Sequence, residues 1–176
     1  MNKGIIFFIL IFSYVLVMTG CSQKPEQQTE SATSAPGDTL SLWNGRDFAG
    51  WEFFLTDSLA DPLSVWSVRN GNLYCSGVPA GYIRTADRFS DYRLIVEWRW
   101  PEEPGNSGVL LHAQKPDKVW PVCIEAQLMS ENAGDFYLIG GTTIREQKDP
   151  ENRRVAKLAE NSEFEPGEWN RYDILC

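Results

Sequence analysis

Three predicted strands carry polar side chains of the kinds that perform acid–base chemistry. In residues 92–100, 108–114 and 122–128, apolar and polar residues alternate, so every second side chain points to the same face. If the three strands are neighbours, one wet face combines carboxylates, an imidazole, a guanidinium and amides. An extended sugar could lie on such a face, which would hold Glu97, Arg99, His112, Gln114, Glu125 and Gln127.

The rest of the domain also favours short strands over helices. Asn70-Gly71 between two apolar runs predicts a hairpin. Residues 136–139 and 169–175 predict two further strands, and the charged stretch 145–161 predicts a long surface loop or a short helix. Together these signals predict an all-β domain, an antiparallel β-sandwich.

The first twenty residues predict a secretion signal. Lys3 precedes an apolar run over residues 4–17, which is too short for a membrane span. Met18-Thr19-Gly20-Cys21 resembles a bacterial lipobox, in which the cysteine is acylated and becomes the first mature residue. Residues 1–20 are therefore predicted to be a lipoprotein signal peptide and Cys21 a lipid anchor in the membrane. An ordinary signal cut near Gly20 and an uncleaved anchor are the alternatives.

The domain organisation follows from composition. Residues 21–38 hold no large apolar side chain and are predicted to be a disordered tether. Residues 39–176 are long enough for one domain with its own core. Ser22 stands where Asp would retain a lipoprotein in the inner membrane, so we expect the outer membrane of the cell envelope.

Charge and composition indicate which classes of binding partner suit the domain. The net charge of −8 and the lack of a basic stripe make nucleic acid an unsuitable partner. Seven tryptophans in an acidic β-domain favour sugar binding, although most of them are expected in the core. Cys75 and Cys123 could form a disulfide or remain free, and the cysteine spacing matches no zinc motif.

Six motifs follow one another along the domain. They are Leu42-Trp43-Asn44-Gly45-Arg46-Asp47-Phe48-Ala49-Gly50-Trp51, Trp66-Ser67-Val68, Gly81-Tyr82-Ile83-Arg84-Thr85, Asn106-Ser107-Gly108-Val109, Glu125-Ala126-Gln127 and Gly167-Glu168-Trp169-Asn170. In this order they resemble the 3-keto-disaccharide hydrolase domain family, and the resemblance runs from Leu40 to Cys176. The resemblance implies a concanavalin A-like jelly roll. Members continue past the last of these motifs, so the domain is expected to lack its final strands and to expose an unpaired edge.

The resemblance also implies the chemistry. A ketone at sugar carbon 3 acidifies the proton on carbon 2, and loss of that proton expels the glycosidic oxygen from carbon 1. Hydration then completes a net hydrolysis. This scheme needs a base of raised pKa, a group that stabilises the enolate, and an acid for the leaving oxygen. Glu125 is the expected base, because burial beside Trp120 and Tyr137 would raise its pKa.

Other residues complete the expected site. His112, the single histidine, is the candidate acid, ketone polariser or metal ligand, or is merely structural. Arg99 is expected to stabilise the enolate or orient Glu125, and otherwise to form a salt bridge with it. The residues expected to contact substrate are Gln127, Asn106, Asp135 and Trp120. A divalent metal on His112, Glu125 and Asp135 is possible, but no spacing demands one.

Two rival functions stay open. A conventional glycosidase would use two carboxylates, for which Glu97 and Glu125 are the candidates. A non-catalytic, lectin-like lipoprotein would instead expose aromatic side chains along a groove. Convergence of Glu125, His112 and Arg99 in one pocket would favour the enzyme.

Overall fold

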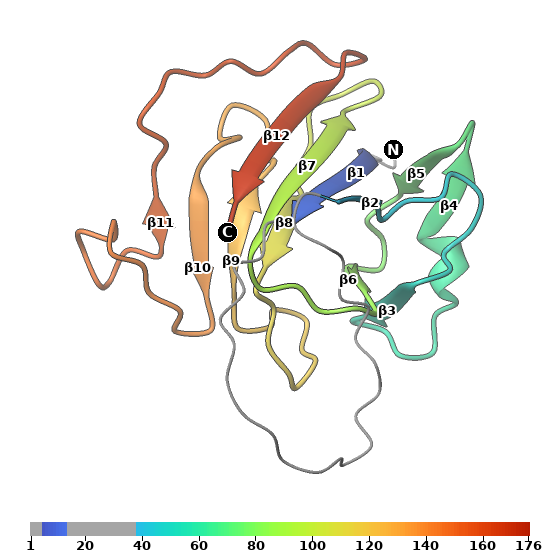
Figure 1. The fold of residues 1–176 in the computed structure, drawn as a ribbon, viewed down its shortest axis with the longest axis horizontal. Helices are drawn as coiled ribbons and strands as arrows, with labels where there is room; N and C mark the ends of the chain where they lie inside the picture. The colour runs from blue at the N-terminus through green and yellow to red at the C-terminus, as the bar shows by residue number, and fades with distance from the viewer. Residues whose placement is uncertain (1–4, 14–37) are drawn as a thin grey trace.

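Strands dominate the chain. The structure is a computed structural model that describes residues 5–13 and 38–176, and within these ranges it has a single short 3-10 helix, η1 (Pro62–Ser64), and no α-helix (Figure 1). The strands are β1 (Ile5–Ser13), β2 (Thr39–Ser41), β3 (Trp51–Leu55), β4 (Trp66–Arg69), β5 (Asn72–Cys75), β6 (Gly81–Thr85), β7 (Tyr92–Arg99), β8 (Gly108–Leu111), β9 (Cys123–Gln127), β10 (Phe136–Ile139), β11 (Arg154–Val155) and β12 (Asn170–Leu175).

The strands form three antiparallel sheets. The largest is six-stranded, with the order β12-β7-β1-β5-β4 and β2 paired to β1. The second has four strands in the order β11-β10-β9-β8, and β3 pairs with β6 alone. The predicted all-β, antiparallel β-sandwich is confirmed. Figure 1 shows β12 and β7 of the six-stranded sheet in front of β8 and β9 of the four-stranded sheet.

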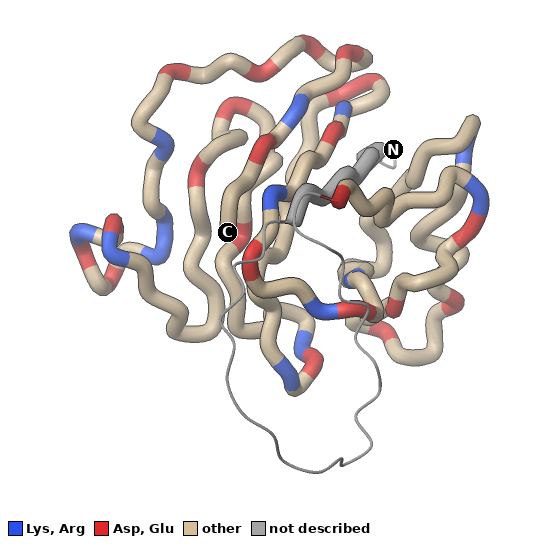
Figure 2. The backbone as a smooth tube through the Cα atoms, in the orientation of Figure 1, with Lys and Arg blue, Asp and Glu red and all other residues tan. Residues whose placement is uncertain are grey.

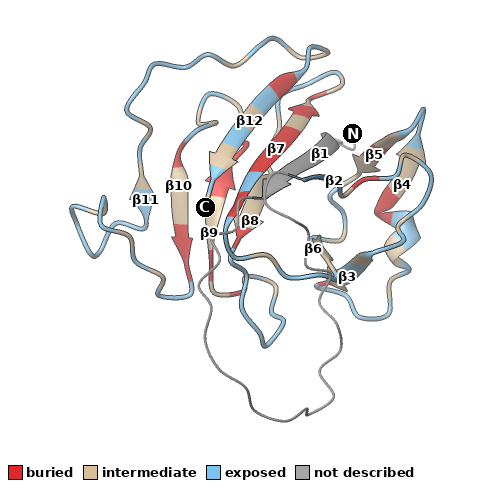
Figure 3. Ribbon diagram, in the orientation of Figure 1, coloured by how far each residue is buried: buried red, intermediate tan, exposed pale blue. Residues whose placement is uncertain are grey.

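The core between the two large sheets comes from the alternation in β7 and β9. Leu94, Val96 and Trp98 of β7 are buried in one cluster with Leu111 and Ala126 of the opposite sheet. Figure 3 shows buried stretches on β7, β9 and β10. The predicted core face of residues 92–100 is therefore confirmed.

The predicted hairpin at Asn70-Gly71 is also confirmed. Asn70 has φ 52° and Gly71 has φ 78°, the left-handed pair that a tight two-residue turn requires. The turn joins β4 to β5, and Trp43 donates from its indole Nε1 to the Gly71 carbonyl at 2.7 Å. This bond attaches the chain before β3 to the hairpin.

Strand β8 is shorter than the predicted strand over residues 108–114. It ends at Leu111 because His112 takes a left-handed conformation, with φ 53°. The turn breaks the alternation that would have put His112 on the face of Leu110. The prediction is therefore wrong from His112 onward.

The charged stretch 145–161 is a largely irregular surface segment, so the loop alternative is right and the short helix is wrong. Its one regular piece is the two-residue β11, which pairs with β10. Charged positions of both signs are interspersed along the described backbone (Figure 2).

Strand β1 lies inside the predicted signal peptide. It pairs with β7, β5 and β2, and it alone links β7 to β5 in the large sheet. Cys21 and all but Asp38 of the predicted tether lie outside the described residues. The signal peptide and the lipid anchor therefore stay predictions. Within the described ranges, no helix has the length and apolar character needed to cross a membrane.

Candidate functional site

Glu125 lines a cavity of about 190 Å³ that lies between the segment from β5 to β6, the residues from the end of β7 to the start of β8, and the loop before β9. The carboxylate shares this cavity with aromatic, amide and hydroxyl side chains. Its principal lining residues are Tyr82, Trp100, Asn106, Ser107, Gly108, Leu110 and Trp120. A carboxylate beside aromatic rings and hydrogen-bonding groups is a suitable wall for a sugar.

Gly108 makes room for the Glu125 side chain. The two residues lie on adjacent strands, where Leu110 is the direct partner of Glu125. A Cβ atom built on Gly108 would lie 2.1 Å from Oε1 of Glu125 and 2.4 Å from its Cγ. Any larger residue would displace the carboxylate, which explains the glycine of the Asn106-Ser107-Gly108 motif.

The pKa of the Glu125 carboxyl is shifted in the direction that suits a general base. Burial raises the pKa of the Glu125 carboxyl, while the positive charge of Arg153 opposes the shift. Tyr137 is the direct partner of Glu125 on β10, and the Arg153 guanidinium lies 5.8 Å from its ring centre. Burial also raises the pKa of Cys123 to about 11, and the Glu125 charge adds to this shift.

Trp120 and Asn106 stand at the rim. The Trp120 side chain is 61% exposed although it lines the cavity. Asn106 is exposed on the segment leading into β8. An exposed indole beside a polar group offers a sugar ring both an apolar face and a hydrogen-bond partner.

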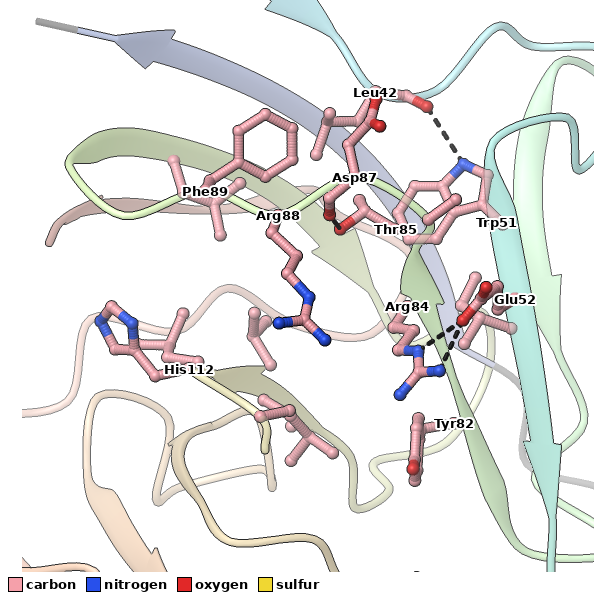
Figure 4. A pocket seen from close by; sticks show the side chains of 18 of the residues that line it. Leu42, Trp51, Glu52, Tyr82, Arg84, Thr85, Asp87, Arg88, Phe89 and His112 are labelled. Carbon is pink, nitrogen blue, oxygen red and sulfur yellow. Dashed lines mark hydrogen bonds and ion pairs between the residues drawn. The ribbon is translucent and has the colours of Figure 1, made fainter. Parts of the chain in front are cut away.

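A larger cavity of about 560 Å³ adjoins the first one. One side of this cavity is formed by β6 and the residues that follow it, and the other side by β8 and the turn at His112 (Figure 4). The two cavities share lining residues, namely Cys75, Gly81, Tyr82, Ser107, Gly108 and Leu110. They therefore form one continuous recess with Glu125 toward one end.

An ion-pair network fixes the loop between β8 and β9 against β6. Arg84 donates from Nε to Glu52 Oε2 at 2.8 Å and forms a second ion pair with Asp117. The Tyr82 hydroxyl donates to Asp117 Oδ1 at 3.1 Å, and burial raises the pKa of Tyr82 to about 12. Because Trp120 belongs to the same loop as Asp117, the network also holds the rim of the smaller cavity.

Comparison with known proteins assigns the family. The model of the 3-keto-alpha-glucoside-1,2-lyase-like domain matches residues 38–176. The chain belongs to this family. No curated protein and no solved structure matches the chain. The suspected relationship to the 3-keto-disaccharide hydrolases is thus confirmed, and the domain belongs to a family of carbohydrate-active enzymes.

The structure does not bring Arg99 to Glu125. Arg99 lies on β7, in the other sheet, and lines neither cavity. It donates from Nη1 to the Gly167 carbonyl at 3.1 Å, and its guanidinium lies 4.8 Å from the Trp169 ring centre. The expectation of one shared polar face is wrong, because β7 and β9 belong to opposite sheets and both turn their apolar faces to the core between them.

Glu97 is separated from Glu125 for the same reason. It lies on β7, where Arg171 of β12 is 3.8 Å from its carboxylate. The expected carboxylate pair of a conventional glycosidase is therefore not formed by Glu97 and Glu125.

His112 belongs to the larger cavity and not to that of Glu125. Its ring centre lies 5.9 Å from that of Tyr92, toward the other sheet, because of the left-handed turn described above. His112 and Glu125 thus line adjoining parts of the recess and not the same cavity.

Gln127 and Asp135 are engaged in the structure of the domain. Oε1 of Gln127 accepts from the backbone N–H groups of Leu128 and Met129, at 2.9 and 2.8 Å. Asp135 is 1% exposed and pairs with Arg154 at 2.7 Å. Neither residue lines either cavity, so the expected contacts of both with substrate are not supported by their placement.

The expected ligands of a divalent metal are also apart. Within the described residues, no group of three or more His, Cys, Asp or Glu side chains could hold a metal ion. His112 lines the larger cavity and Glu125 lines the smaller one, whereas Asp135 is buried in the protein interior. Cys75 and Cys123 are free thiols, so the disulfide alternative is not realised.

The sequence analysis missed two residues that line the recess and one whose charge acts on Glu125 from outside it. Arg153, and not Arg99, is the arginine whose charge acts on Glu125. Tyr82 and Arg84 come from β6, a strand that was not predicted. The signal that could have found them is their spacing: residues two apart on a strand point to the same face. Tyr82 and Arg84 do so, and both line the larger cavity.

Proposed function

We propose that the domain cleaves 3-keto-glycosides in the cell envelope by elimination and hydration. Glu125 removes the proton from carbon 2, the bond between carbon 1 and the glycosidic oxygen breaks, and the leaving oxygen takes up a proton. Water then adds a hydroxyl to carbon 1 and returns a proton to carbon 2. The net reaction is a hydrolysis in which the ketone is recovered.

One observation carries this proposal: the Glu125 carboxylate is held over Gly108 in a cavity where burial raises its pKa. A base close to the operating pH transfers protons most effectively. Desolvation raises the pKa of the carboxyl and so makes the carboxylate a stronger base for a carbon-bound proton. The family of the domain provides the substrate class.

The surroundings of Glu125 support the remaining steps. Trp120 offers an exposed face on which the keto sugar can stack. Arg153 is exposed and lies outside the lining of both cavities, and its positive charge acts on the carboxylate from there. The same charge would favour the anion that develops when the proton leaves carbon 2. Asn106 and Ser107 supply hydrogen-bonding groups at the rim.

The location is part of the same proposal. The predicted signal peptide and lipobox cysteine would deliver the domain to the envelope and anchor it through Cys21. The residues between Cys21 and the domain would then act as a spacer from the membrane. We assign the anchor to the outer membrane, because Ser22 stands where Asp would retain a lipoprotein in the inner membrane.

Cleavage assays on paired substrates test the activity. A 3-keto-glycoside and its unoxidised parent are incubated with the full chain, with Glu125→Gln and with Glu160→Gln, an exposed control outside both cavities. We expect only the keto sugar to be cleaved, at least 10²-fold slower by Glu125→Gln and at the normal rate by Glu160→Gln. Cleavage of the parent sugar would contradict the proposal.

A second candidate, sugar binding without chemistry, is favoured by the exposure of Trp120. A lectin-like domain would bind the keto sugar and its parent alike, and Glu125→Gln would leave both affinities unchanged. Binding without cleavage of either sugar would replace the enzyme by this function.

A further inference from the structure

We propose that the larger cavity binds a carboxylate-bearing sugar unit through Arg88. This inference rests on the proposed function and specifies its substrate: a 3-keto-glycoside whose second unit is a uronic acid. The keto unit would occupy the cavity of Glu125, and the acidic unit the cavity of Arg88 and His112.

The continuity of the two cavities supports an occupant with two units. Tyr82, Ser107 and Gly108 line both of them. Glu125 lines only the smaller cavity, whereas Arg88 and His112 line only the larger one. A glycosidic bond beside the shared residues would place one sugar ring in each cavity.

Arg88 is one of two cations of the larger cavity's lining, with Lys115, that form no ion pair within the described part of the chain. Its guanidinium points into the larger cavity between Arg84 and His112 (Figure 4). Arg84 is already paired with Glu52 and Asp117, whereas Arg88 forms no ion pair or side-chain hydrogen bond with any residue that the structure describes. Its planar donor groups thus remain open to a ligand, and they match the two oxygens of a carboxylate.

The lining of the larger cavity carries one more positive than negative charge, and Asp117, which pairs with Arg84, stands outside that lining. Arg84, Arg88 and Lys115 line the cavity, against the carboxylates of Glu52 and Asp87. The whole chain carries a net charge of −8. A local excess of positive charge in a concave site attracts anions despite the overall charge.

The wall also has the parts that a sugar ring needs. Trp51 and Phe89 present aromatic surface, and the indole Nε1 of Trp51 is fixed by donating to the Leu42 carbonyl at 3.0 Å. His112 is exposed, lies across Arg88 from Arg84 in Figure 4, and adds a polar ring. An aromatic face for the ring and a guanidinium for the acid together describe a uronic acid subsite.

Binding of two simple sugars tests the proposal. D-Glucuronate and D-glucose are titrated into the full chain, and affinity is followed by calorimetry or ligand-observed NMR. Arg88→Gln removes the guanidinium, and Arg145→Gln removes an equal charge from an exposed residue outside both cavities. We expect glucuronate to bind at least tenfold more tightly than glucose, and Arg88→Gln but not Arg145→Gln to abolish the difference.

Two outcomes would overturn the inference: equal binding of the two sugars by the normal chain, or equal losses in both arginine variants. Arg88→Lys retains the charge without the planar fork and is expected to bind glucuronate with intermediate affinity; it also replaces Arg88→Gln should that variant misfold. Glu125→Gln separates the two proposals, since it should lose cleavage and keep the glucuronate preference.

Discussion

Replacing Gly108 by alanine tests how strictly the chain positions Glu125. The added Cβ would lie 2.1, 2.4 and 2.6 Å from Oε1, Cγ and Cδ of Glu125, where ordinary contacts begin near 3.4 Å. The carboxylate must therefore move by more than about 1 Å, and a misplacement of that size costs roughly 10²-fold in rate.

The effect on stability is expected to be much smaller. Overpacking costs about 1–3 kcal/mol, and Gly108→Ala should lie at the low end because the end of a Glu side chain can rotate away. Gly140→Ala is the matched control. Its Cβ would lie 2.8 Å from Val122 Cγ2, at a residue with φ 69°, so it loses stability without meeting Glu125.

The assay combines cleavage of a 3-keto-glycoside with thermal unfolding of both variants. We expect Gly108→Ala to lose at least 10²-fold in kcat while remaining folded, and Gly140→Ala to keep its kcat at temperatures where it is folded. A folded Gly108→Ala with normal kcat would refute the idea that this glycine positions the carboxylate.

Three further predictions concern stability and binding. Because the folded pKa of Glu125 is raised above its usual 4.5, its neutral form favours the folded state; this advantage is present at low pH and is lost as pH rises through the folded pKa. Denaturant titrations from pH 4 to 8 should therefore show the normal chain losing stability relative to Glu125→Gln, and a constant difference would contradict the burial of the charge. Asp117→Ala releases the loop that carries Trp120, so KM should rise several-fold, while unfolding measurements should show a loss of only about 1 kcal/mol from this partly exposed network; an unchanged KM would show that the loop position does not matter. Deleting residues 1–20 gives the chain that cleavage at the proposed lipobox would leave, and it takes β1 from between β5 and β7. This processed form is expected to melt at a lower temperature than the full chain and to self-associate in sedimentation experiments; equal melting temperatures would show that the mature domain does not need β1.

The elements that local pattern controls were predictable. The alternation in β7 and β9 gave the correct core faces, and Asn70-Gly71 gave the correct turn. The raised pKa of Glu125 was also predictable, because an aromatic strand neighbour and a nearby tryptophan imply desolvation.

The grouping of site residues was not predictable in the same way. Polar residues on three strands suggest one face only if the strands share a sheet, and nothing local places β7 in one sheet and β9 in the other. His112 was misplaced because its left-handed backbone is rare for a residue other than glycine.

Retention of isotope at carbon 2 tests the central claim most directly. A 3-keto-glycoside carrying deuterium at carbon 2 is cleaved in ordinary water by the full chain, and the released keto sugar is analysed at early times by mass spectrometry. If Glu125 removes that hydrogen before the glycosidic bond breaks, the product carries hydrogen from solvent, cleavage is slowed by the deuterium, and Glu125→Gln produces neither effect. Deuterium retained in the product at the normal rate of cleavage would contradict the mechanism.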